Sequence, residues 1–405
     1  MSDKGISALY VHVPFCVCKC AYCDFASRAV AERDDVFGRY VQTLRAQIER
    51  FGSAGLLSTC ATAYVGGGTP SLLGPSLLGG LVSEMRRWCP ELTELTCEAN
   101  PDSLSDELLA TIREAGATRL SIGVQSLQDG ELKALGRVHD ARAARERVTA
   151  AVATGLDVSV DLMCAIPLQT PDSWRDTLGQ VVALEPDHVS VYPLAIEEGT
   201  PFWERYGDSD PAWNGEDVQA ERMETAASIL GAAGYVRYEV ASYARADKAC
   251  RHNQAYWTGA SYLGLGVAAS SMFDAETYRA VRRIMTQLPA VDDDVARVRM
   301  TNVDDIDRMA EGQGLGNLGY DLELLDARQA IAEDLMLGMR LSEGVDERLA
   351  SKCPPEVWSD LIERGLVTKR GSRMVSTHRG WLLGNELYGT LWGLSEGPVR
   401  EASSA

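Results

Sequence analysis

Short apolar runs alternate with longer amphipathic stretches along the first two-thirds of the chain. The apolar runs have the length of strands, while the longer stretches repeat their apolar residues with helical periodicity. We predict strands at residues 9–13, 61–65, 95–98, 119–123, 158–163 and 188–194. We predict helices between them at residues 36–51, 77–88, 105–115, 141–153 and 172–184. Repeated strand–helix units imply an α/β fold with a parallel sheet, and six of them favour a partial (β/α)6 barrel.

The rhythm changes after about residue 275. Residues 321–385 are typical of two or three helices that end in a short hairpin, formed by residues 365–368 and 374–377. Helices followed by a small hairpin are typical of a winged-helix-like unit. We therefore predict two domains, a partial barrel at residues 1–275 and a small, mostly helical, winged-helix-like domain at residues 276–405.

Composition and charge exclude several classes of protein. Apolar residues make up 45% of the chain and charged residues 24%, which is ordinary for a folded globular protein and excludes a disordered or collagenous one. The net charge of −19 argues against a nucleic-acid partner. Residues 291–350 hold 15 Asp and Glu against 6 Arg, and we expect them to form a solvated acidic face. The apolar stretches are too short to cross a bilayer and the N-terminus has no apolar signal core, so we expect a cytoplasmic protein.

Polar residues stand where the predicted strands end. Glu98 and Gln125 close two strands, and a third strand runs into the sequence GGGTP at residues 66–70. In parallel α/β folds the ligand site lies at the carboxyl ends of the strands. Asp161 lies inside an otherwise apolar strand, so its carboxylate should point into the barrel and needs a partner there. That partner is either a ligand or an inward-facing arginine.

Four of the ten cysteines crowd into eight residues. Cys16, Cys18, Cys20 and Cys23 follow the first predicted strand directly, whereas the other six are scattered and typical of buried thiols. Cys16, Cys20 and Cys23, with three and then two residues between them, can hold three corners of a [4Fe–4S] cluster and leave one iron open to a small molecule. Structural zinc is the alternative, but it usually shows two separated pairs of ligands, and no second pair follows here.

This cysteine spacing, with Tyr22 before the last cysteine, resembles the radical S-adenosylmethionine (SAM) superfamily. The glycines of residues 66–70 resemble the strand end with which that superfamily binds the methionine amino group. Residues 10–16 (YVHVPFC), 98–101 (EANP), 121–126 (SIGVQS) and 136–139 (GRVH) resemble the oxygen-independent coproporphyrinogen III oxidase-like family. So do the sequence from Asp161 to Pro167 and residues 190–192 (SVY), and the match runs in order from residue 8 to about residue 270.

Two departures separate the chain from the oxidases themselves. The oxidases carry a further cysteine two residues after the third cluster cysteine and a long N-terminal extension, whereas here Phe25 stands at that position and nine residues precede Tyr10. Residues 252–257 (HNQAYW) instead resemble the H-N-x-x-Y-W signature of the haem chaperone (HemW) branch. Residues 333–338 and 340–341 resemble the C-terminal domain of that branch.

The resemblance implies roles for individual residues. Cys16, Cys20 and Cys23 would bind the [4Fe–4S] cluster, and His252 would bind haem iron. On the residues alone, His252 instead hydrogen-bonds its loop and orders Tyr256, and Cys250 is a further possible iron ligand. Cys18 either competes for the cluster or is a bystander. The residues implied in SAM binding are Tyr10, Tyr22, Gly67, Gly68, Thr69, Glu98, Gln125, Arg137, Asp161 and Ala195.

The implied function is that of a haem chaperone, which binds haem and passes it to an acceptor protein, such as a membrane respiratory protein. The implied cofactors are a [4Fe–4S] cluster, SAM and haem, together with an electron donor for the cluster. Two radical enzymes are the alternatives: an oxidase that converts coproporphyrinogen III to protoporphyrinogen IX, and an enzyme for another reaction on a tetrapyrrole. The sequence leaves open whether SAM is cleaved and therefore whether the protein is an enzyme.

Overall fold

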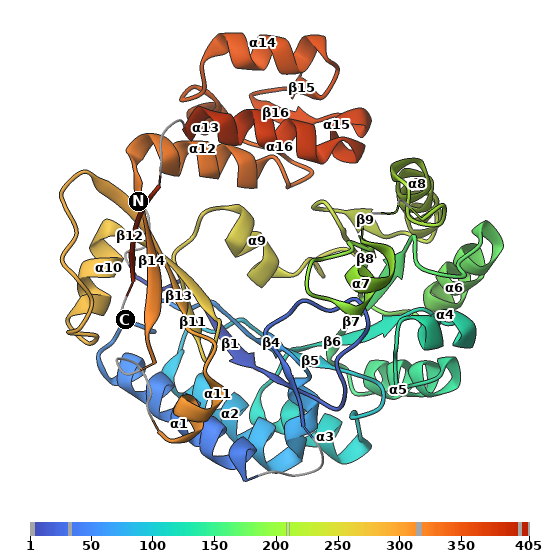
Figure 1. Cartoon of the computed structure of the whole chain (residues 1–405), viewed down its shortest axis with the longest axis horizontal. Coiled ribbons are helices and arrows are strands. Elements are labelled where there is room, and N and C mark those ends of the chain that lie inside the picture. The colour runs from blue at the N-terminus through green and yellow to red at the C-terminus, as the bar shows by residue number, and fades with distance from the viewer. Residues whose placement is uncertain are drawn as a thin grey trace.

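One large sheet organises the protein. The computed structural model describes residues 5–30, 35–207, 209, 211–312, 318–395 and 399–403. Within that part of the chain the main sheet has 13 strands, in the order β17-β14-β13-β12-β11-β1-β4-β5-β6-β7-β8-β10-β9. Figure 1 shows the sheet curving through the centre of the molecule, with helices on its outer side. This is the partial barrel that the sequence predicts.

All six predicted strands are confirmed, and each pairs in parallel with the next along the chain. They are β1 (Ala8–Val13), β4 (Thr62–Gly67), β5 (Glu94–Ala99), β6 (Arg119–Gln125), β7 (Asp157–Cys164) and β8 (His188–Pro193). The five predicted helices are confirmed between them, as α1 (Val36–Ser53), α2 (Gly74–Trp88), α3 (Asp106–Ala115), α5 (Ala141–Ala153) and α6 (Pro171–Ala183). The parallel order brings the carboxyl ends of these strands to one edge of the sheet.

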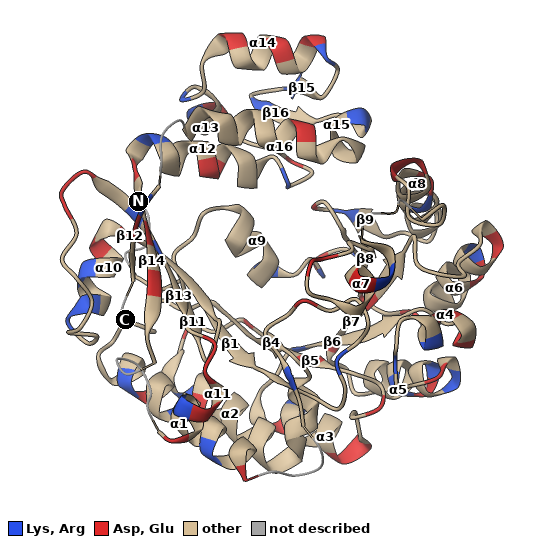
Figure 2. Cartoon of the chain, viewed as in Figure 1, with Lys and Arg blue, Asp and Glu red and all other residues tan. Residues whose placement is uncertain are grey.

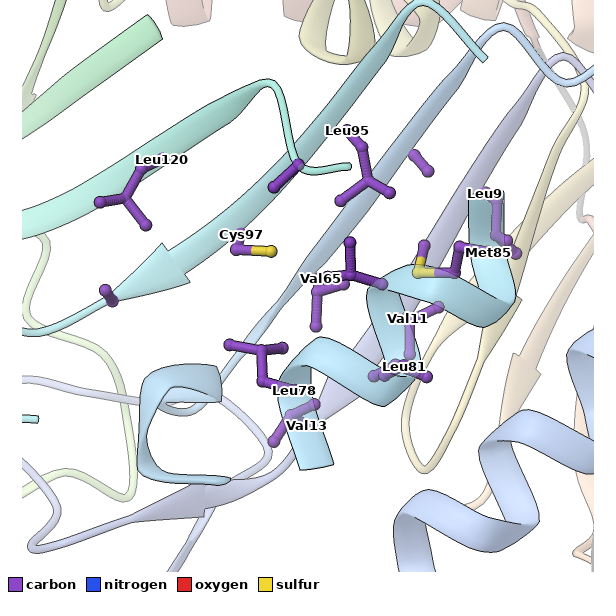
Figure 3. Close-up of a cluster of buried hydrophobic side chains, with 14 of the residues drawn as sticks. Leu9, Val11, Val13, Val65, Leu78, Leu81, Met85, Leu95, Cys97 and Leu120 are labelled. Carbon is purple, nitrogen blue, oxygen red and sulfur yellow. The ribbon is translucent and has the colours of Figure 1, made fainter. Parts of the chain in front are cut away.

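The outward-facing side chains of the strands pack on the helices and form the main core. Val11, Val65 and Cys97, from three adjacent strands, are fully buried against Leu81 of α2. Figure 3 shows this layer, in which the side chains of α2 lie against those of the strands. Because successive strand residues point to opposite faces, filling the outer face with apolar side chains leaves the residues between them facing the inside of the barrel.

The sheet extends beyond the six predicted strands. β11 (Tyr262–Leu265) pairs in parallel with β1, and the sheet continues with antiparallel strands. These are β12 (Ser270–Asp274), β13 (Val295–Asn302), β14 (Tyr320–Asp326) and β17 (Arg400–Ser403). At the other edge of the sheet, β10 (Ser242–Ala244) pairs antiparallel with β8, and β9 (Val236–Arg237) pairs antiparallel with β10. The prediction that residues 321–326 begin a helix is wrong, because Tyr320 and Leu322 alternate with exposed residues as in a strand.

Helices and a hairpin follow β14, as predicted, but the helices outnumber the two or three expected, and two of them come after the hairpin. The helices are α12 (Ala327–Gly338), α13 (Glu347–Ala350), α14 (Pro355–Glu363), α15 (His378–Leu382) and α16 (Gly384–Trp392), and the hairpin pairs β15 (Val367–Arg370) with β16 (Arg373–Ser376). Leu335, Leu361, Leu387 and Leu391 centre a second apolar core in this region. The sheet itself runs past residue 275 through β13, β14 and β17, and the domain division at that residue stays a prediction.

Figure 2 shows the charged residues mainly on the helices around the sheet, with the strands at its centre largely uncharged. The acidic segment at residues 291–350 is more than a solvated face, because part of its charge is paired internally. Arg297 and Arg299 on β13 both form ion pairs with Glu333 on α12, which is buried. Within the described residues no helix is long and apolar enough to span a bilayer.

Candidate functional site

A cavity of about 410 Å3 lies at the carboxyl ends of the parallel strands. One wall is the loop after β1, which contains all four clustered cysteines, and most of the rest of the lining comes from the strands and the residues that follow them. Of the residues predicted to bind the cluster or SAM, twelve line this cavity. They are Cys16, Cys20, Tyr22, Cys23, Gly67, Gly68, Thr69, Glu98, Gln125, Arg137, Asp161 and Ala195. The structure therefore brings together residues that are up to 179 positions apart in the sequence.

The strands contribute every second residue to the cavity. This follows from the pleat of a strand, since the intervening residues belong to the core on the other face. Glu98 and Asp161 lie on this inner face of β5 and β7, each between two further residues of its strand that line the cavity. The lining residues on or just after β5 to β8 are Thr96, Glu98, Ala99 and Asn100; Arg119, Ser121, Gly123 and Gln125; Ser159, Asp161 and Met163; and His188, Ser190, Tyr192 and Leu194, so that Ala99 alone among them departs from the alternation.

The cysteine loop is held at both ends by backbone hydrogen bonds. Cys16 ends the short strand β2 (Phe15–Cys16), which pairs with β3 (Arg28–Ala29). The amide of Ala21 donates to the carbonyl of Leu135 at 3.1 Å, and the carbonyl of Ala21 accepts from the amide of Phe202 at 2.8 Å. These bonds place the loop across the open end of the barrel, where its thiols face the strand ends.

The thiols have the chemistry that a cluster requires. All ten cysteines are free, and Cys16, Cys20 and Cys23 are each partly exposed. Burial raises the pKa of the thiols of Cys16 and Cys23, so both are protonated until iron displaces the proton. No three His, Cys, Asp or Glu side chains of the described chain converge on one point as the ligands of a single metal ion do. A cubane cluster does not need that convergence, because each thiolate binds a different iron.

Arg137 joins the cysteine loop to the strands. Its guanidinium donates to the sulfur of Cys20 at 3.5 Å, and to Asn100 Oδ1 and the carbonyl of Gly123 at 2.7 Å each. Asn100 in turn donates to Thr69 Oγ1, whose hydroxyl donates to the sulfur of Cys16 at 3.6 Å. Arg137 Nε is buried without a hydrogen-bond partner, so one donor at the cavity is available to a ligand.

Two carboxyl groups, those of Glu98 and Asp161, line the cavity. Glu98 accepts from the hydroxyl of Tyr64 at 2.7 Å and from the amide of Gly67 at 3.1 Å. Burial, with a smaller contribution from the charge of Asp161, raises the pKa of Glu98 to about 7. Asp161 accepts from the hydroxyl of Ser121 at 2.8 Å, and burial raises its pKa also. In the ligand-free protein, the surroundings of both carboxyl groups therefore disfavour the charged form. A cationic ligand would stabilise that form.

The glycines at the end of β4 permit a close approach of two backbones. A Cβ at Gly68 would lie 2.6 Å from the carbonyl oxygen of Phe15, and one at Gly67 would lie 2.5 Å from the ring of His12. Gly67 also has a φ of 114°, which disfavours any other residue. Gln125 has a positive φ of 65° where the register between β6 and β7 shifts. The backbone therefore adopts a positive φ at the cavity end of both β4 and β6.

The two remaining predicted residues lie elsewhere. Tyr10 lines a neighbouring cavity, to which Gly67 and Glu98 also contribute. His252 is 1% exposed on α9 (Arg251–Trp257), and burial lowers its pKa to about 3. Its Nδ1 bonds Thr62 Oγ1 and its Nε2 bonds the hydroxyl of Tyr256, both at 3.0 Å. In this position His252 orders Tyr256 and has no free nitrogen for iron, so its role as a haem ligand stays a prediction.

Several cavity residues were not found from the sequence. Asn100 connects Arg137 to Thr69, and Tyr64 holds Glu98, yet neither was given a role. The inward serines are Ser121, Ser159 and Ser190. Their signal was the polar residue at every second position of an otherwise apolar strand, the same signal that identified Asp161.

The pKa of Glu98 generates a prediction for the ligand-free protein. A buried carboxyl group with a raised pKa holds its proton more tightly in the folded state than in the unfolded state. Its contribution to stability is therefore largest below about pH 4.5 and is lost as the pH rises towards 7. Glu98→Gln removes this titration. We therefore expect the change in the free energy of unfolding caused by the substitution to be more favourable at about pH 8 than at about pH 4.5, by up to about 3 kcal/mol. Denaturant unfolding at both pH values measures this difference, and an effect that is the same at both would contradict it.

Comparison with known proteins finds a superfamily match over part of the chain and relatives over nearly all of it. Residues 10–181 match the model of the radical SAM superfamily. The heme chaperone HemW of Mycobacterium tuberculosis is 34% identical over 390 residues, which cover 95% of this chain and 94% of the relative. The heme chaperone HemW of Bacillus subtilis is 30% identical over 403 residues, covering 96% and 100%. The solved structure of coproporphyrinogen III oxidase (HemN) from Escherichia coli superposes with a TM-score of 0.73 at 20% identity, covering 97% of this chain and 90% of that one, which shows a shared fold.

Proposed function

Because the chain belongs to the heme chaperone HemW family of radical SAM proteins, we propose that it binds haem and passes it to an acceptor protein, with a [4Fe–4S] cluster and SAM held in the barrel cavity. The observation that carries this proposal is the meeting of three free thiols, a buried arginine and two buried carboxyl groups around one cavity. The relatives named as haem chaperones supply the haem part of the proposal.

The cavity suits the charges of SAM. SAM carries a carboxylate, an amino group and a sulfonium cation, so it needs a basic partner, acidic partners and fixed donors. Arg137 would bind the carboxylate with its free Nε, and Glu98 and Asp161 would receive the cationic groups or the ribose hydroxyls. Tyr22 on the cysteine loop and Ala195 after β8 line the same cavity and would contact the adenosine. A bound cluster and SAM supply electron transfer, and with it the capacity to generate a radical.

The cysteine loop favours the chaperone over the oxidase. Phe25 stands where the oxidases have a further cysteine, and its side chain is 62% exposed at the mouth of the cavity. An apolar exposed ring contributes neither a thiol nor a proton donor there. The partners proposed with this function are an acceptor protein for haem and an electron donor for the cluster, and the proposed location is the cytoplasm.

The cluster ligands can be separated from the bystander by one series of variants. Cys16→Ser, Cys20→Ser and Cys23→Ser should each lose most of the iron and sulfide bound after anaerobic reconstitution, because each removes one corner ligand. Cys18→Ser is the matched control, since Cys18 is exposed on the same loop and its nearest polar contact is the carbonyl of Gly136 at 3.9 Å. Iron and sulfide analysis with the cluster absorbance measures the result. A Cys18→Ser protein as depleted as the other three would overturn the assignment of three ligands.

The haem proposal is tested on the reconstituted wild-type chain. Titration with haemin should give one bound haem per chain by visible absorbance, and incubation with coproporphyrinogen III, SAM and a reductant should give no protoporphyrinogen IX. The absence of haem binding, together with release of 5′-deoxyadenosine on addition of coproporphyrinogen III, would reject the chaperone and support the oxidase.

A further inference from the structure

A second and larger cavity, of about 790 Å3, adjoins the first. The two cavities share Phe25, Gly67 and Glu98, so the wall between them is one residue thick at these positions. The other walls of the second cavity come from strands β1, β12 and β13, from α9, and from α12 and α16 of the C-terminal region. It therefore lies where the barrel meets the C-terminal helices.

The second cavity differs from the first in chemistry. Its lining is mainly apolar and aromatic, with Trp257 on α9, Trp392 at the end of α16, and Met336 and Leu337 on α12. Its one arginine among the described lining residues, Arg299, is already paired with Glu333 and Glu323, so the wall offers no unpaired cation. Flat rings and thioethers around a space of this size suit a large, planar, apolar ligand.

His12, Tyr10 and Tyr256 of the lining are already hydrogen-bonded within the protein. His12 bonds the hydroxyl of Tyr10 at 2.9 Å and the carbonyl of Ala26 at 2.7 Å, so both of its ring nitrogens are engaged. The hydroxyl of Tyr256 bonds His252, and burial raises the pKa of both Tyr10 and Tyr256, which disfavours a phenolate. His12 therefore has no free nitrogen for iron, and the two phenols are protonated and would have to lose a proton to bind it, whereas a thioether sulfur binds iron without losing a proton.

Two methionines line the cavity, and they differ in exposure. Met272 on β12 is 4% exposed and is enclosed by the sheet. Met336 on α12 is only partly buried, and its side chain lines the cavity. Methionine sulfur is an established type of axial ligand for haem iron. Met336 is therefore the lining residue best placed to reach an iron atom in this space.

We propose that the second cavity is the haem site and that Met336 provides a thioether ligand to the iron. The proposal rests on the proposed function and adds to it a position and a ligand. In this arrangement the H-N-x-x-Y-W segment builds the site instead of binding the iron: Asn253 lines the first cavity, Tyr256 and Trp257 line the second, and His252 holds Tyr256. Ligands in the two cavities would be neighbours across Glu98.

The test compares two methionines one turn apart. Met336→Leu keeps nearly the same volume and removes only the sulfur, whereas Met339→Leu makes the same change at a residue that is 1% exposed within the C-terminal core. Each full-length protein, and the wild type, is titrated with haemin in its oxidised and reduced forms. We expect Met336→Leu to weaken haem binding at least about tenfold and to abolish the sulfur-to-iron charge-transfer absorption, with Met339→Leu like the wild type.

A third variant tests the position independently of the ligand. Trp392→Ala removes a wall of the second cavity and no residue of the first, so it should weaken haem binding and leave SAM binding unchanged. Wild-type haem binding that neither Met336→Leu nor Trp392→Ala alters would overturn this inference alone. A wild-type chain that binds no haem would overturn the proposed function as well, so the two failures are distinguishable.

Discussion

The buried guanidinium of Arg137 is the interaction on which the arrangement of the site depends. It reaches the sulfur of Cys20 on the loop, the side chain of Asn100 after β5 and the backbone of Gly123 on β6. A buried cation is costly unless it is fully paired, so the three elements must come together around it. Its Nε has no hydrogen-bond partner, and a ligand carboxylate would supply the missing acceptor.

The fold supplies two spaces of different character from one sheet. Parallel strands bring polar residues to one edge and make the smaller cavity, while β12 and β13 carry the sheet on to the C-terminal helices, which close the larger one. Glu98 faces both spaces, with a pKa near 7 caused by burial. A ligand that changes the charge of Glu98 from one side changes the electrostatic environment on the other. Such a shared group is a physical route by which the two cavities can influence each other.

The sequence was most informative where structure is local. The apolar runs and the cysteine spacing depend on neighbouring residues, and both the six parallel strands and the loop after β1 were predicted correctly. The strand β13 was missed because Arg297 interrupts its apolar pattern, and this arginine is buried only because Glu333 and Asp334, more than 30 residues later, pair with it. His252 was expected in a polar loop, and its burial depends on Thr62, 190 residues earlier. Contacts at such separations leave no pattern in the local sequence.

We propose that the first cavity holds an iron–sulfur cluster whose open iron binds SAM. The most direct measurement is the electron paramagnetic resonance spectrum of the reduced, reconstituted protein before and after SAM is added, with SAM labelled at its amino nitrogen or carboxylate oxygen. We expect SAM to shift the spectrum of the cluster and the label to add a hyperfine coupling, because the labelled atom would bind iron. A cluster spectrum that SAM leaves unchanged, in a protein shown separately to bind SAM, would contradict it.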